Sequence, residues 1–147
     1  MRWALISLFA LSCHDSASQR TYTDSGALCL RASTHALRAE VKLLGCVSSS
    51  CNRQTVNNCV ISRQGEQIII SSRLVLERNK ANCATDCSSW TIRCEIPAPS
   101  SGTYQVAFGA ARAALTLPLE RDTEIAPDGS TRPCAAEEPQ LGVSPQM

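Results

Sequence analysis

The stretch Leu37-Arg38-Ala39-Glu40-Val41-Lys42-Leu43 alternates apolar and charged side chains at every position. A period of two places the apolar side chains on one face of an extended chain and the three charges on the other. In a helix the same charges would be scattered around the whole cylinder. The stretch therefore predicts a β-strand with one face in a hydrophobic core and the other in water.

Similar signals recur on both sides of this strand. Further strands are expected at residues 29–30, 59–62, 67–76, 90–96, 104–108 and 113–119. Turn residues separate them, such as Gly65 in the segment 63–66, the Pro-Ser-Gly segment 97–102 and the segment 109–112. About seven short strands without a helical period predict an all-β fold, a disulfide-stapled antiparallel β-sandwich.

The segment Pro99-Ser100-Ser101-Gly102-Thr103-Tyr104-Gln105-Val106 resembles the tyrosine corner of immunoglobulin-like and fibronectin-like sandwiches. The resemblance implies that the Tyr104 hydroxyl bonds to the backbone just upstream, and that the last two strands form the closing hairpin of such a domain. Antibody domains have a cysteine two residues after this tyrosine, where this chain has Val106. We therefore expect an immunoglobulin-like sandwich that departs from antibody topology.

The first residues form a second pattern. Met1-Arg2 is followed by the uncharged, mostly apolar stretch 3–12 and then by Cys13, which is the shape of a signal peptide. Ala10-Leu11-Ser12-Cys13 resembles the bacterial lipobox. The resemblance implies that Cys13 becomes the first mature residue and carries the lipid. The alternatives are a conventional signal peptide cleaved further along and a buried N-terminal helix.

Cysteine is the most unusual feature of the composition, with nine in 147 residues. Lipidation of Cys13 leaves an even number, which disulfides can pair in an oxidising compartment. The disulfide candidates are Cys29, Cys46, Cys51, Cys59, Cys83, Cys87, Cys94 and Cys134. Cys94 shares a strand face with Trp90, so Cys59 and Cys29 are its preferred partners. Cys134 is expected to pin the C-terminal tail to the domain.

These patterns divide the chain into four parts. Residues 1–12 are expected to be a lipoprotein signal peptide, and residues 13–26 a polar tether anchored by lipid at Cys13. The β-sandwich is expected to occupy residues 27–119. Residues 120–147, with four of the seven prolines and no apolar period, read as a C-terminal tail.

Composition and motifs argue against most kinds of chemistry. The formal net charge is +1 and aromatic residues make up 4% of the chain, which disfavours nucleic-acid binding. Cys46-x4-Cys51 and Cys83-x3-Cys87 lack the spacing of zinc or redox pairs. His35 is expected in an exposed turn, with no nucleophile motif, and Asp86 in turn chemistry rather than a calcium site. We therefore predict no enzyme, no metal and no cofactor.

The remaining hypothesis is a non-catalytic interaction or structural protein of the cell envelope. Two Ser/Asn-rich loops that carry cysteines, residues 47–58 and 79–89, are the expected contacts with a protein or surface ligand. The alternative is a small disulfide-rich inhibitor of an envelope or foreign hydrolase. In lipoproteins that resemble this chain, an Asp after the lipidated cysteine often signals retention at the inner membrane. His14 at that position indicates the outer membrane.

Overall fold

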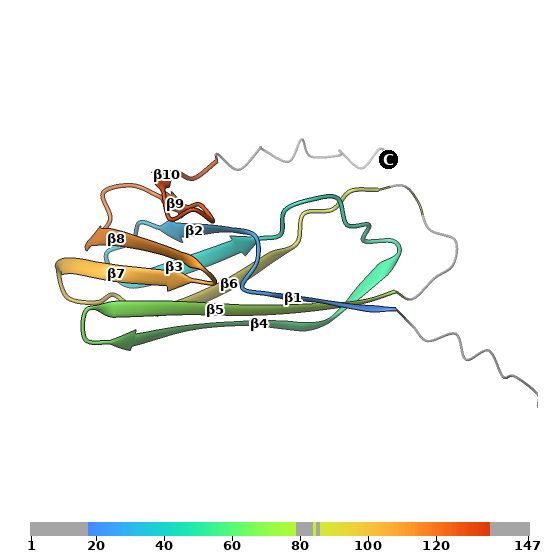
Figure 1. Ribbon diagram of the computed structural model, residues 1–147, viewed down its shortest axis with the longest axis horizontal. Helices are drawn as coiled ribbons and strands as arrows, with labels where there is room; N and C mark the ends of the chain where they lie inside the picture. Colours follow the sequence, from blue (N-terminus) through green and yellow to red (C-terminus); the bar gives the residue numbers. More distant parts are fainter. Residues whose placement is uncertain (1–17, 79–83, 85, 136–147) are drawn as a thin grey trace, which may run out of the picture.

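The computed structural model describes residues 18–78, 84 and 86–135, which fold into two packed β-sheets (Figure 1). The strands of this described part are β1 (Gln19–Thr23), β2 (Ala27–Arg31), β3 (Ala36–Lys42), β4 (Asn52–Gln64), β5 (Gln67–Arg78), β6 (Thr91–Pro97), β7 (Gly102–Phe108), β8 (Ala111–Leu117), β9 (Thr123–Ile125) and β10 (Thr131–Pro133). The expected all-β sandwich is confirmed. Strands β2 to β8 are the seven expected from the sequence.

The first sheet is built around the long strand β5. Strand β4 pairs antiparallel with β5 along its whole length. The other side of β5 is shared, because β7 pairs with residues 67–70 and β1 with residues 73–77. Strand β8 completes the sheet beyond β7. The β5–β7 pair is parallel, which corrects the expectation of purely antiparallel sheets.

The second sheet has the order β10-β9-β2-β3-β6, and every pair in it is antiparallel. Its inner face carries the alternating apolar residues of β2 and β3. They pack against the inner residues of β5, β7 and β8 from the first sheet. The core includes Leu28, Leu30, Leu37, Ala39, Val41, Ile68, Ile70, Leu74, Leu76, Tyr104, Val106, Phe108, Leu115, Leu117 and Ile125. The apolar side chains that alternate along these strands thus fill the space between the two sheets.

Local chemistry fixes the turns as expected. Gly65, in the hairpin between β4 and β5, has a φ of 61°, which a residue without a Cβ adopts at little cost. The Tyr104 hydroxyl donates to Ser100 O at 2.9 Å, the bond that the tyrosine-corner resemblance implied. This bond ties β7 to the turn that precedes it.

The expected tether was partly wrong. Residues 19–23 form β1, which pairs with Arg73–Glu77 of β5. Tyr22 is the only apolar side chain in β1, and it is half-buried against the core. A polar strand of this kind is held by backbone pairing rather than by apolar burial, so its sequence lacks the usual alternation.

The expected tail was also wrong over its first half. Residues 123–125 and 131–133 form β9 and β10 at the edge of the second sheet. Ile125 is in the core. Glu124 beside it forms an ion pair with Arg132 at 2.5 Å. Cys29 and Cys134 form a disulfide, which joins the end of this segment to β2. The sandwich therefore extends well beyond residue 119.

Candidate functional site

Two segments that precede β4 and β6 meet at one end of the sandwich. We call residues 43–51 and 86–90 the loop end. A disulfide between Cys46 and Cys87 joins them, and Ser88 N donates to Val47 O at 3.1 Å. The expected loop 47–58 was too long, because β4 begins at Asn52. The side chains at the start of β4 are polar on both faces, so the hydrophobic periodicity of the sequence does not reveal where this strand begins.

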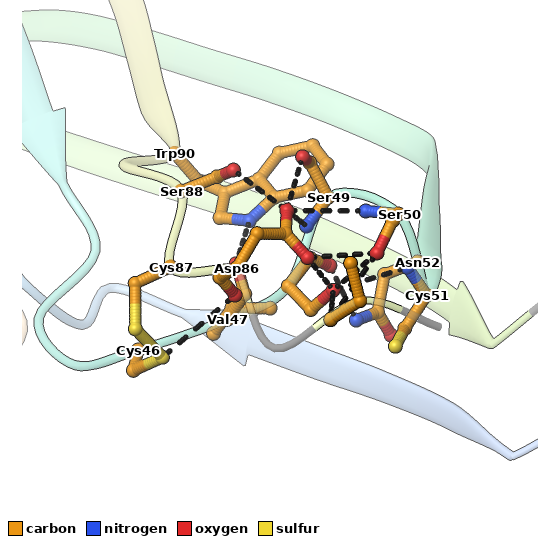
Figure 2. Close-up of a disulfide and its surroundings, with 12 residues drawn as sticks. Cys46, Val47, Ser49, Ser50, Cys51, Asn52, Asp86, Cys87, Ser88 and Trp90 are labelled. Atoms are coloured by element: carbon orange, nitrogen blue, oxygen red, sulfur yellow. Dashed lines mark hydrogen bonds between the residues drawn. A yellow bond between two sulfur atoms is a disulfide. The ribbon is translucent and has the colours of Figure 1, made fainter. Parts of the chain in front are cut away.

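Asp86 connects the same two segments a second time, through hydrogen bonds (Figure 2). Its carboxylate accepts hydrogen bonds from the Oγ atoms of three consecutive serines, Ser48, Ser49 and Ser50. The Ser49 and Ser50 Oγ atoms each lie 2.7 Å away. The backbone N atoms of the same two residues donate at 3.0 and 3.3 Å.

These donors hold the pKa of the Asp86 carboxyl well below its usual range, with Ser48 contributing most, then Ser50 and Ser49. Hydrogen bonds to the charged form of a carboxylate lower its pKa in this way. The carboxylate therefore stays ionised at neutral pH and is a poor base. Although three hydroxyls surround it, the group is suited to holding a loop and not to activating a nucleophile.

The sequence explains why the serines converge on one point. Ser49 and Ser50 lie in a turn, and their N–H and O–H groups converge with the Ser48 hydroxyl on the one carboxylate. Cys51 N donates to Ser48 Oγ at 3.2 Å, and Asn52 Nδ2 donates to Ser48 O at 2.7 Å. The turn is thus closed from within as well as by Asp86.

The loop end is also joined to the core. Leu43 N donates to Trp90 O at 2.9 Å, and the Trp90 indole Nε1 donates to Val47 O at 3.3 Å. Val47 and Leu43 are buried, and Trp90 packs against the core cluster. The inner side of the loop end therefore continues the hydrophobic core, while its outer side faces water.

The outer side has an unusual composition. Leu44 is 63% exposed and lies beside Gly45, and Ser49 and Ser50 are exposed as well. Asp86 is the only charged residue of the loop end, and its charge is fully engaged by the serines. The surface thus offers hydroxyl groups and one large apolar side chain, with no free charge.

The loop end lies where the N-terminal segment enters the sandwich. Ser18 O accepts from Arg78 N at 3.2 Å, and Arg78 pairs with Asn52, which follows the loop end directly. Figure 1 shows the start of β1 and the segment before β4 at the same end of the molecule. The hairpin turn at Gly65 and Glu66 lies at the far end of β4 and β5.

The cysteines expected to pair do so where the structure describes them. Cys94 is bonded to Cys59, one of its two expected partners. Cys51 is also disulfide-bonded. Cys13 and Cys83 lie outside the described residues, as do residues 79–83 and 85 of the second expected loop. Disulfides thus tie β4 to β6, β2 to the segment after β10, and the two segments of the loop end.

The other residues considered for chemistry lie apart. His35 is exposed just before β3, and the length of that strand separates it from the loop end. Among the residues that the structure describes, no group of three or more His, Cys, Asp or Glu side chains could hold a metal ion. No helix long and apolar enough to cross a membrane occurs in that part of the chain.

Sequence reasoning singled out Asp86 but not its serine partners, and it did not single out Leu44. Asp86 was expected to bond within its own turn, where Ser88 Oγ does donate to it at 3.4 Å, but its other donors come from the opposite segment. Leu44 directly follows the alternating stretch 37–43, outside its period of two. The available signal was the position of Asp86 beside Cys87, but only the pairing of Cys87 with Cys46 brings the serines to it.

Comparison of the chain with known protein families, curated proteins and solved structures finds no match. The immunoglobulin-like character of the sandwich therefore stays a prediction from the tyrosine-corner motif. Function has to be argued from the surface itself.

Proposed function

We propose that this chain is a lipid-anchored protein of the bacterial cell envelope, and that its loop end binds another protein at the membrane surface. The observation that carries the proposal is the double clamp on the loop end. The Cys46–Cys87 disulfide and the Asp86 carboxylate both join its two segments. The lipid anchor rests on the lipobox resemblance at Cys13.

A clamped loop loses little conformational entropy when a partner binds, so more of the contact energy appears as affinity. The exposed groups of a serine turn can be satisfied by water, so their bonds to Asp86 are not required to pair them. Here three hydroxyls and two N–H groups bind one carboxylate from another segment. The clamp fixes the shape of an exposed surface.

Leu44 supplies the apolar contact that such a surface needs. Binding energy in protein interfaces is concentrated in a few large side chains surrounded by neutral contacts that exclude water. Leu44 is 63% exposed and is followed by the uncharged serine turn. This arrangement fits a neutral protein surface with an apolar depression better than it fits nucleic acid or an ionic ligand.

The position of the loop end suggests where the partner is. Residues 14–18 span at most about 17 Å when fully extended, because β1 already begins at Gln19. With lipid on Cys13, the end of the sandwich that carries Ser18 is held close to the bilayer. The loop end lies at that same end. The partner is therefore expected to be a membrane protein or another anchored protein.

Site-specific photo-crosslinking in the producing bacterium tests the proposal. A photo-reactive amino acid is placed at Leu44 or at Ser49, both exposed on the loop end, and at Glu66 in the opposite turn as the matched control. Crosslinking at positions 44 and 49 should give one discrete heavier species that fractionates with membranes, and position 66 should not give it. The same species from all three positions, or none from the loop end, would contradict the proposal.

A further inference from the structure

Strand β4 has a long free edge. It pairs with β5 on one side, and no described strand pairs with its other side. Most of its residues are exposed. A free edge presents a row of backbone N–H and C=O groups that can pair with another strand. Proteins usually block such edges, so an unblocked one needs a reason.

Three of the other edges of the sandwich are blocked by recognisable means, and the fourth, β1, is only five residues long. Strand β10 is short and ends in Pro133. Strand β6 carries exposed Arg93 and Glu95 within its length and ends in Pro97. Strand β8 is covered by the turn between β9 and β10, where a Cβ on Gly129 would lie 2.4 Å from Arg112 O. Short length, charge, proline and cover are the usual protections.

Strand β4 has little of this protection over residues 56–64. The segment contains no proline, no lysine and no acidic residue. Its one irregularity, a shift in register between Gln54 and Val56, precedes the segment. Val60 lies in its middle and is 51% exposed, the one large apolar side chain besides Leu44 that the described residues expose to this degree. Exposed β-branched residues favour cross-strand pairing.

We propose that residues 56–64 of β4 pair antiparallel with the same segment of a second copy of this chain, with Val60 on the two-fold axis. Val60 then lies opposite Val60 of the second copy, and the two apolar side chains cover each other. Ser62 lies opposite Asn58, and Arg63 opposite Asn57. Each copy contributes the same surface, as a two-fold interface requires.

The arginines of β4 favour this register. With the axis at Val60, Arg53 lies beyond the paired segment. An axis at Asn58 instead places Arg53 opposite Arg63 of the second copy, and like charges directly opposite each other destabilise a strand pair. Arg53 is paired with Glu77 at 3.0 Å, and Arg63 lies 5.2 Å from the centre of the Tyr104 ring. Both side chains are thus occupied within their own copy.

The second sheet supports the same axis. Cys59, next to Val60, is bonded to Cys94 in the middle of β6. A two-fold axis at Val60 therefore passes near Cys94 and brings the Arg93 end of one β6 toward the Glu95 end of the other. Both side chains are more than half exposed, although Arg93 is also paired with Glu40 at 3.0 Å and Glu95 with Arg38 at 2.9 Å within the same copy. The opposite charges are complementary across the axis, which favours a second copy over an unrelated strand.

The pairing buries a small area, because it joins one strand edge to another. Interfaces of this size give weak, reversible association, with dissociation constants of about 10 μM or higher. The dimer is independent of the loop end, so each proposal can fail without the other.

Sedimentation equilibrium of the exported full chain, in density-matched detergent at about 1 to 200 μM, tests the proposal. The wild type is expected to shift from monomer to dimer over this range. Val60→Lys places two ammonium groups across the axis and is expected to raise the dissociation constant at least tenfold. Gln105→Lys, on the exposed face of the central strand β7 in the same sheet, is the control and should leave it unchanged.

A monomer at every concentration would overturn the proposal. So would a dimer that Val60→Lys leaves intact, or one that both variants weaken equally. A photo-reactive amino acid at position 60 gives a second readout that does not depend on a charged variant. It should yield a covalent dimer of the chain, while the same group at position 105 should not.

Discussion

The sandwich body and the loop end are held together by different forces. Between the sheets, alternating residues such as Leu28, Ile68 and Leu74 are almost completely buried, and apolar burial stabilises the fold. At the loop end, a disulfide and a carboxylate with five donors from the opposite segment hold two segments whose outer side chains face water. The body therefore specifies the fold, whereas the loop end maintains the shape of a surface.

A matched pair of leucine truncations tests this difference most strongly. Leu28→Ala removes a fully buried side chain from β2 and should lower the free energy of unfolding by about 3 kcal/mol, because it leaves a cavity. Leu44→Ala removes the same atoms from the exposed loop end and should change it by less than about 0.5 kcal/mol. Urea denaturation followed by circular dichroism measures both. Equal effects would show that Leu44 is part of the core.

A smaller, local effect is expected for Asp86→Asn. Loss of the charged acceptor should speed hydrogen exchange of the Ser49 and Ser50 amides about tenfold, with little change in exchange within β2 or β5. Asp128→Asn is the matched control. That carboxylate accepts from Ser130 N at 2.9 Å and Ser130 Oγ at 2.7 Å, away from the loop end. Unchanged exchange at Ser49 and Ser50 would contradict the clamp.

The pH dependence of hydrogen exchange at the Ser49 and Ser50 amides tests whether the acceptor is the ionised Asp86 carboxylate. The pKa of the Asp86 carboxyl is lower in the folded protein than in the unfolded chain. Its stabilisation of the loop end is therefore complete above the unfolded pKa of about 3.9 and is lost progressively as the pH falls below that value. The difference between the wild type and Asp86→Asn should therefore be largest above about pH 4 and shrink in more acidic solution. A difference that grows with acid would exclude ionised Asp86 as the acceptor.

The sequence was sufficient for strands that bury one face. Alternation located β3 and β6, and the pairing of Cys59 with Cys94 agrees with the shared inner face that the alternation implies. It was insufficient for β1, β9 and β10. These strands are short or polar, and backbone pairing, a disulfide and ion pairs hold them in place. Such contacts join residues far apart in the chain, and no local pattern records them.

The candidate surface shows the same limit. The cysteine-bearing loops could be found from composition, but the beginning of β4 at Asn52 could not, because an exposed edge strand has no apolar period. The bonds from Ser49 and Ser50 to Asp86 depend on how the fold brings two distant segments together. A partner surface that contains Leu44 therefore required the three-dimensional structure.

The most direct test of the central claim is the intact mass of the protein taken from bacterial membranes, before and after reduction with alkylation. A lipid-anchored, disulfide-bonded envelope protein should begin at Cys13, carry acyl mass, and take up alkyl groups at eight cysteines only after reduction. A chain that retains residues 1–12 and whose cysteines react without reduction would contradict the account, since both the anchor and the clamped loop end depend on export to an oxidising compartment.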